Sequence, residues 1–126
     1  MNLRLKTIGF VLLAMSARAQ SGPVSNAPDG SVLFRNQCGV CHVVDSAAPA
    51  RQGPHLSGIV GRKPGSVAGY KYSAGYAQAD FIWDPAHLDA YLTNPQEVIH
   101  GSTMAYKQAK PETRGAIIAY LESLTP

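Results

Sequence analysis

Cysteine, charge and long apolar runs are all scarce in this 126-residue chain. It has only two cysteines, and no second CxxC or histidine pair at ligand spacing follows them, which argues against a zinc site. The apolar run at residues 8–15 is too short to span a bilayer. No segment alternates apolar and polar residues, as a half-buried strand would. These absences favour an all-α protein without stable membrane insertion.

The two cysteines fall in one pentapeptide, Cys38-Gly39-Val40-Cys41-His42. Two cysteines separated by two residues and followed by a histidine are typical of a covalent attachment site for haem c. Each thiol forms a thioether with one haem vinyl group, and His42 is then placed to ligate the iron. A thioredoxin-like CxxC would follow a strand, whereas the residues before Cys38 have a helical pattern. A plain disulfide gives no reason for His42, so the motif predicts one covalent haem c.

The first 19 residues have the features of an export signal. Arg4 and Lys6 precede the apolar run, and Ala17-Arg18-Ala19 is a small-x-small cleavage site. This pattern predicts a signal peptide over 1–19 and a periplasmic protein. The leader holds three of the 11 Lys and Arg residues and none of the 8 Asp and Glu residues, which leaves eight of each in the mature chain. Such a balance gives no indication of nucleic-acid binding.

The rest of the chain is predicted to be a flexible segment at 20–28 and one all-α domain over 29–126. The Gly- and Pro-rich stretch 43–69 is expected to be a long loop around the haem edge. Start and stop signals predict helices from Gly30 after the N-cap Asp29, over 73–79, from Asp84-Pro85 to before Asn94-Pro95, and from Pro111 onward.

A low-spin haem iron takes two axial ligands, and His42 supplies one. Met104 is the only methionine left once the leader is removed, and it lies in a polar loop rather than on a helical stripe. Three histidines compete for the second position, namely His55, His87 and His100, and His100 is only four residues from Met104. A thioether ligand raises the reduction potential relative to a second imidazole. His/Met ligation would mean electron transfer rather than oxygen chemistry, because no iron position stays open.

From Gly30 to Leu124 the sequence resembles the class I c-type cytochromes, the group of mitochondrial cytochrome c and bacterial cytochrome c2. Gly30 and Phe34 match the glycine and the aromatic residue with which the first helix of that family crosses the last. Tyr120 matches the partner aromatic on the last helix. The resemblance implies the class I cytochrome c fold, in which helices and loops wrap around one covalently bound haem.

The resemblance also implies roles on one side of the haem. Gly53-Pro54 resembles the segment whose proline carbonyl accepts a hydrogen bond from the proximal imidazole, here that of His42. Arg62 matches the arginine that neutralises a haem propionate. Tyr72 and Trp83 match donors of hydrogen bonds to the propionates.

On the other side, Tyr91 matches the tyrosine near the methionine sulfur, and Gly101-Ser102-Thr103-Met104 matches the ligand loop. The loop departs from the family pattern at His100, which replaces a proline, and at Thr103, which replaces a lysine. The implied haem-binding residues are Cys38, Cys41, His42, Pro54, Arg62, Tyr72, Trp83, Tyr91 and Met104, with His42 and Met104 on the iron.

These features predict a monomeric periplasmic electron carrier, not an enzyme, which exchanges single electrons with other redox proteins. One alternative is a haem c subunit or electron acceptor dedicated to a periplasmic dehydrogenase. Another is a haem enzyme or gas sensor with a labile distal ligand. Lysines that usually ring the haem edge are replaced by Thr93, Gln96 and Glu97. Docking is therefore expected through an apolar rim that includes Ala105 and Tyr106.

Overall fold

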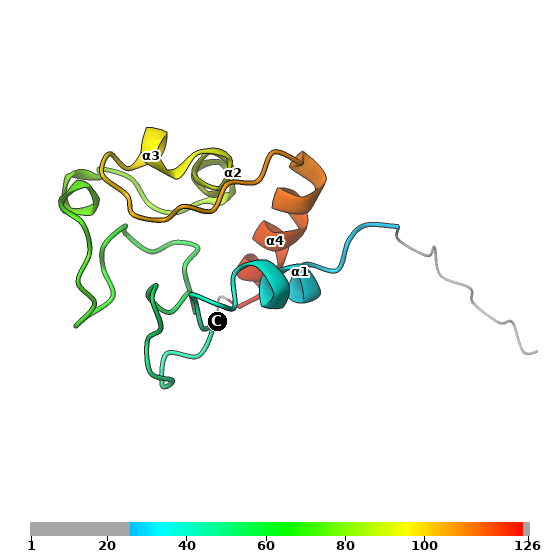
Figure 1. Cartoon of the computed structure of the whole chain (residues 1–126), viewed down its shortest axis with the longest axis horizontal. Helices are drawn as coiled ribbons and strands as arrows, with labels where there is room; N and C mark the ends of the chain where they lie inside the picture. Colours follow the sequence, from blue (N-terminus) through cyan, green and yellow to red (C-terminus); the bar gives the residue numbers. More distant parts are fainter. Residues whose placement is uncertain (1–25, 125–126) are drawn as a thin grey trace, which may run out of the picture.

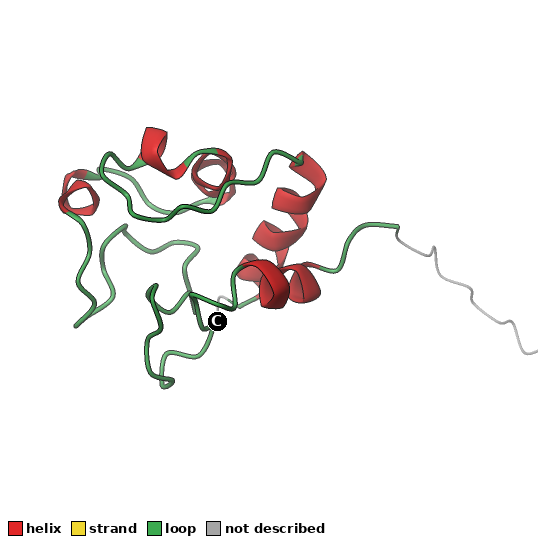
Figure 2. Cartoon of the chain, viewed as in Figure 1, coloured by secondary structure: helices red, strands yellow, loops and turns green. Residues whose placement is uncertain are grey.

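The computed structural model describes residues 26–124, which form short helices joined by long loops (Figures 1 and 2). No strand occurs within that range, so the predicted all-α class is confirmed. The predicted signal peptide and residues 20–25 lie outside the described residues. The elements in chain order are α1 (Gly30–Gln37), the 3₁₀ helix η1 (Ala74–Gln78), α2 (Pro85–Thr93), α3 (Pro95–Val98) and α4 (Pro111–Ser123).

Helices α1 and α4 pack against each other (Figure 1), and Gly30 in the first turn of α1 meets Ala116 of α4. Asp29 caps α1 as expected, because its carboxylate accepts hydrogen bonds from the backbone N–H groups of Ser31 and Val32 at 2.9 and 3.3 Å. The rings of Phe34 and Tyr120 meet at the crossing with their centroids 5.5 Å apart. The predicted contact between the first and last helices is therefore present.

Gly30 is the residue that permits this close crossing. A Cβ atom added there would overlap the backbone carbonyl of Ala116 and lie 2.9 Å from the Cβ of Tyr120. Glycine is a poor helix former, so its position in the first turn of α1 costs helix stability. The close approach of two helix backbones explains why a glycine stands there.

Helix α2 has the predicted start and stop. Asp84 caps it by accepting from the backbone N–H of His87 at 2.8 Å, and Pro85 occupies the first turn. The sequence did not predict α3, which begins at Pro95 directly after α2. A single turn is too short to show an apolar period, and it is fixed here by the Ile99 N–H, which donates to the Pro95 carbonyl at 2.9 Å.

The chain from 38 to 73 has neither helix nor strand, as the loop prediction for 43–69 requires. Tertiary hydrogen bonds hold it instead. The Gly53 N–H donates to the Cys41 carbonyl at 2.8 Å, and the Trp83 N–H donates to the Arg62 carbonyl at 2.9 Å. These bonds bring the loop back to the haem motif at one point and to Trp83 at another.

A single core of buried apolar side chains joins the helices to this loop. Its members are Phe34, Ile59, Trp83, Leu88, Tyr91, Leu92, Ile99, Ile117, Ile118 and Leu121. Of the predicted stripe on α4, Ile117, Ile118 and Leu121 are buried, and Leu124 packs against the core from its edge. None of the helices within residues 26–124 has the length and hydropathy to cross a membrane.

Two glycine-to-alanine changes test the helix crossing. We expect Gly30→Ala to destabilise the holoprotein by about 1–3 kcal/mol, because the new methyl group overpacks the contact between α1 and α4. Gly115→Ala is the matched control, since an added Cβ there meets no atom within 4 Å. It should stabilise the protein by about 0.5–1 kcal/mol through helix propensity. Guanidinium unfolding midpoints decide, and equal shifts in the two variants would contradict the close-packing account.

Candidate functional site

One cavity of about 350 Å³ lies between the long loop, the crossing helices and the segment around Met104. All nine residues that the sequence analysis selected contribute to its lining. They come from six places in the chain: the turn after α1, the loop at 54 and 62, the segment before η1, the segment before α2, α2 itself and the segment before α4. The fold therefore brings together the complete predicted set.

The CxxCH motif is a single turn that continues α1. Cys38 follows the last residue of α1, and its carbonyl accepts from the N–H groups of Cys41 and His42 at 3.0 and 2.9 Å. This turn places both thiols at the same cavity. Burial raises the pKa of the Cys38 thiol to about 11. Redox CxxC motifs lower that pKa, so the site differs from the thioredoxin type.

The imidazole of His42 is held in one orientation. Its Nδ1 lies 2.8 Å from the Pro54 carbonyl oxygen, and because a carbonyl only accepts, Nδ1 carries the proton and Nε2 keeps its lone pair. Burial lowers the pKa of His42, which favours the neutral ring that a metal requires. Gly53 leaves room for the ring, since a Cβ there would lie 2.6 Å from Nδ1.

Arg62 is a half-buried cation in the cavity lining. Its guanidinium donates to the backbone carbonyls of Ser57 and His55 at 2.8 and 3.1 Å. Within residues 26–124 no carboxylate forms an ion pair with it. Burial lowers the pKa of Arg62, because the charged guanidinium is less well solvated there and no carboxylate of the described chain compensates for it. The side chain is therefore available to an anionic group in the cavity.

Two further hydroxyls, those of Tyr72 and Ser73, belong to the cavity lining. The Tyr72 Oη accepts from the Val67 N–H at 3.3 Å and retains its own proton for donation. The hydroxyl of Ser73 is buried and has no hydrogen-bond partner within the described chain. A buried hydroxyl without a partner is costly, so Ser73 fits a polar group that enters the cavity. The sequence analysis missed Ser73, because a serine before a short helix indicates only a cap.

Trp83 and Tyr91 belong both to the core and to the cavity wall, with 5 and 7 % of their surfaces exposed. Their rings pack edge to face at 4.9 Å. Burial raises the pKa of Tyr91 well above its usual value, so its hydroxyl stays protonated.

The hydroxyl of Tyr91 belongs to a cluster of three. It lies 2.5 Å from the Tyr76 hydroxyl and 2.9 Å from that of Ser102, and Tyr76 and Ser102 are 3.2 Å apart. Ser102 also accepts weakly from the Met104 N–H at 3.4 Å. The cluster thus reaches the candidate ligand loop. The sequence analysis missed Tyr76, which nothing in the pattern around η1 distinguishes from a core aromatic residue.

Met104 is half-buried and packs against the core. The side-chain amide of Gln96 donates to the carbonyls of Met104 and Ser102 at 2.8 and 3.2 Å, which ties the loop to α3. Gln96 is one of the positions where related proteins were expected to carry lysine. In this protein Gln96 anchors the loop segment from Ser102 to Met104.

The three competing histidines do not line the cavity. His55 bonds to the hydroxyl of Ser57 at 2.9 Å. His87 stacks on Phe81 with ring centroids 4.3 Å apart and bonds to its own cap, Asp84. His100 is exposed and borders a separate small pocket. Tertiary packing thus separates them from the two thiols.

An all-α domain in which a CxxCH turn and long loops enclose one cavity is the arrangement of a class I c-type cytochrome. The family model for cytochrome c matches residues 27–125 of the chain. Cytochrome c of Gossypium barbadense is 39% identical over 110 residues, covering 86% of this chain and 99% of that protein. Cytochrome c of Guizotia abyssinica is 38% identical over 104 residues, covering 82% and 94%.

A third relative, cytochrome c of Chlamydomonas reinhardtii, is 36% identical over 112 residues, covering 88% of this chain and 99% of that protein. The chain therefore belongs to the cytochrome c family. As a member it carries one covalently attached haem c with its iron, and it is a haem-based electron carrier.

The residues of the cavity fit this cofactor. Two thiols on one turn suit the two vinyl groups, and a neutral imidazole with a free Nε2 suits the iron. The cation of Arg62 and the orphaned hydroxyl of Ser73 suit the propionates. Apolar side chains such as Leu88 and Ile117 supply the wall that a large apolar ring requires.

Gly53→Ala tests how tightly the imidazole is seated. The added methyl group would collide with the His42 ring, so we expect the ring to move off the Pro54 carbonyl and the yield of holoprotein to fall severalfold. Haem-stained gels and the absorbance spectrum of the purified protein measure both effects. Gly115→Ala again serves as control. A wild-type yield and spectrum for Gly53→Ala would show that the His42 ring tolerates a methyl group at this position, which would contradict the close contact described here.

Proposed function

We propose that this protein is a periplasmic electron carrier whose haem iron is ligated by His42 and Met104. The observation that carries the ligand assignment is the shared cavity: both side chains line the space that also receives the thiols of Cys38 and Cys41. The competing histidines lie outside it. The haem supplies one iron that takes up or releases a single electron.

The chain's own groups set the properties of that centre. The bond from His42 Nδ1 to the Pro54 carbonyl fixes the imidazole and increases its basicity as a ligand. The soft thioether of Met104 raises the potential relative to a second imidazole. Two protein ligands leave no position for oxygen, which supports simple electron transfer rather than catalysis.

Three residues are proposed to bind the propionates. Arg62 offsets their charge, because its guanidinium has only backbone carbonyls as partners. A hydrogen-bonded contact between this guanidinium and a propionate carboxylate would be strong, since both groups are charged. Tyr72 and Trp83 are proposed as hydrogen-bond donors beside it. Tyr91 is proposed to border the methionine sulfur from its place in the hydroxyl cluster.

The partner-facing edge is proposed to lie at the segment after Met104. Thr103 and Ala105 line the cavity and are exposed, so the cavity opens to solvent at this segment as well as at Lys63 and Lys71. Neither Thr103 nor Ala105 is charged. Electron-transfer contacts are small and brief, and a neutral edge of this kind supports docking by an apolar contact rather than by strong electrostatic steering.

Met104→Ala is the experiment that tests the ligand assignment. Loss of the thioether should lower the reduction potential and open an iron position that binds carbon monoxide in the reduced protein. Thr103→Ala, a change at the exposed neighbour, is the matched control and should leave the spectrum unchanged. His100→Ala tests the rival ligand in the same way. If Met104→Ala kept the wild-type spectrum and potential while His100→Ala lost them, His100 would be the ligand.

The periplasmic location is supported by the leader alone, so it needs its own measurement. When the full-length gene is expressed in a bacterium with a haem c assembly system, the holoprotein should appear in the periplasmic fraction. Its intact mass should equal the chain from Gln20 onward plus one haem that resists acid–acetone extraction. Cys38→Ala should weaken this attachment. A cytoplasmic product that retains residues 1–19 would contradict the location.

A further inference from the structure

Gln108, four residues after Met104, has both polar groups of its backbone engaged. Its N–H donates to the carbonyl of Leu92 at the end of α2 at 2.8 Å. Its carbonyl accepts from the guanidinium of Arg114 at 3.0 Å, as does the carbonyl of Ala109 at the same distance. The chain is thus fixed to α2 and to α4 at this point.

Arg114 is itself firmly placed. The residue is only 8 % exposed, and its guanidinium also contacts Asp89 of α2, with nitrogen–oxygen distances of 2.7 and 3.3 Å. Those bonds satisfy its charge, in contrast to Arg62. Arg114 therefore acts as a rigid donor from α4 to the two carbonyls of the loop.

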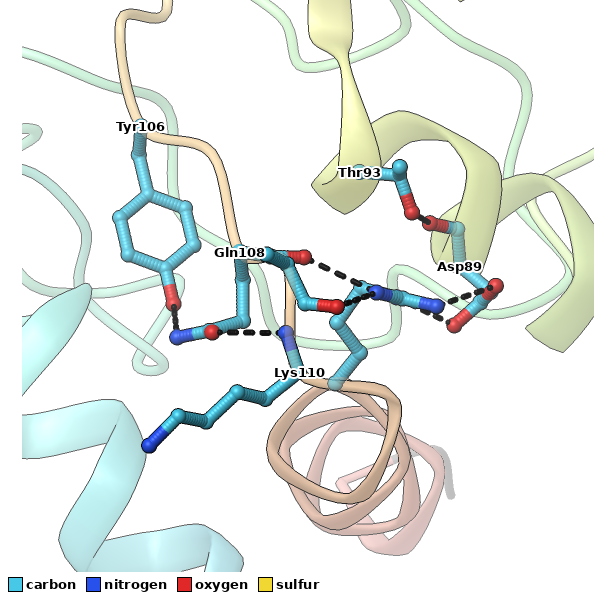
Figure 3. A network of polar contacts seen from close by, with 7 residues as sticks. Asp89, Thr93, Tyr106, Gln108 and Lys110 are labelled. Atoms are coloured by element: carbon cyan, nitrogen blue, oxygen red, sulfur yellow. Dashed lines mark hydrogen bonds and ion pairs between the residues drawn. The ribbon is translucent and has the colours of Figure 1, made fainter.

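The side chain of Gln108 is as fully used as its backbone. Its Nε2 carries two protons, and it donates to the Gln37 Oε1 at 3.1 Å and to the Tyr106 hydroxyl at 3.2 Å. Its Oε1 accepts from the N–H of Lys110 at 3.1 Å. The Tyr106 hydroxyl in turn donates to the same Gln37 oxygen at 2.5 Å. Figure 3 shows Gln108 between Tyr106 and Lys110.

This triad of Gln37, Tyr106 and Gln108, here called the clasp, joins the two sides of the haem site. Gln37 is the last residue of α1 and directly precedes Cys38, whereas Tyr106 follows Met104 by two residues. Gln37 and Tyr106 both line the cavity. The clasp therefore ties the covalently attached side of the site to the loop that carries the methionine.

We infer that the clasp is a positioning device that holds Met104 on the iron, an inference that rests on the proposed His/Met ligation. The methionine loop has two anchors: Gln96 binds the Met104 carbonyl before the exposed residue Ala105, and Gln108 binds after it. For the sulfur to leave the iron, the segment between the anchors must open. The clasp hydrogen bonds are present when the loop is closed and lost when it opens, so they raise the free energy of the open state relative to the closed state. They therefore strengthen the Met104–iron bond without contacting the metal.

Tyr106 has a second role in this arrangement. The sequence analysis expected it as part of an apolar docking rim. Its hydroxyl is bonded to Gln37 and Gln108, and the residue is half-buried in the cavity lining, so its ring is held in a fixed position at the cavity edge. A fixed aromatic ring over that edge limits the access of small exogenous ligands.

The test is the affinity of the ferric holoprotein for imidazole, which competes with the methionine sulfur for the iron. We expect Gln37→Leu and Gln108→Leu to raise this affinity about tenfold, the effect of losing one or two net hydrogen bonds that hold the closed loop. Gln37→Glu should remain within about twofold of the wild type, because a carboxylate oxygen still accepts from both donors. Gln78→Ala, at an exposed glutamine of η1, is the unrelated control.

Three outcomes would overturn different parts of this account. Wild-type affinity in Gln37→Leu, together with a large gain in Met104→Ala, would overturn the clasp and leave the His/Met proposal intact. Wild-type affinity in Met104→Ala would overturn the ligation itself. Equal gains in Gln37→Leu and Gln37→Glu would overturn the hydrogen-bonding role, because glutamate keeps both the shape of glutamine and the accepting oxygen. Met-to-iron charge-transfer absorbance, recorded during denaturant unfolding, should disappear before global unfolding in Gln108→Leu and together with it in Gln78→Ala.

Discussion

The close crossing of α1 and α4 at Gly30 and Ala116 is the contact on which the rest of the structure depends. Helix α1 ends in the turn that presents both thiols and His42. Helix α4 carries Arg114, which fixes α2 and the carbonyls at the end of the methionine loop. Because the crossing sets the relation between these helices, it sets the relation between the two sides of the haem. A side chain at Gly30 would disturb a cofactor site that it does not touch.

Two arginines show how the same side chain takes different roles in one small protein. Arg114 is buried, and its charge is satisfied by Asp89 and by backbone carbonyls. Arg62 is half-buried, and within the described residues it has carbonyl partners but no carboxylate. A buried cation is tolerated when it is paired, so Arg114 is complete within the protein, whereas Arg62 is proposed to be completed by an anionic ligand. The charge that lacks a partner, rather than the charge as such, marks the binding site.

Much of the site could be predicted because its chemistry is local in the sequence. The CxxCH turn needs only five consecutive residues, and the N-caps Asp29 and Asp84 mark their helices within one turn. What was missed depends on distant partners. Tyr76 is significant only beside Tyr91 and Ser102, and Ser73 only because its hydroxyl is buried without a partner. Gln37 and Gln108 lie 71 positions apart, and no pattern in either segment indicates the other.

The sequence by itself determined the cofactor and the helical class, and it supplied the residues proposed to attach the haem and the candidates for the second ligand, because each follows from residue types at short spacing. Only the tertiary structure separated Met104 from the three histidines. Composition makes all four side chains possible donors, but His55, His87 and His100 are engaged or exposed elsewhere, while Met104 lines the cavity. Ligand choice is a matter of which donor atoms share one enclosed space, and that is decided by packing between segments far apart in the chain.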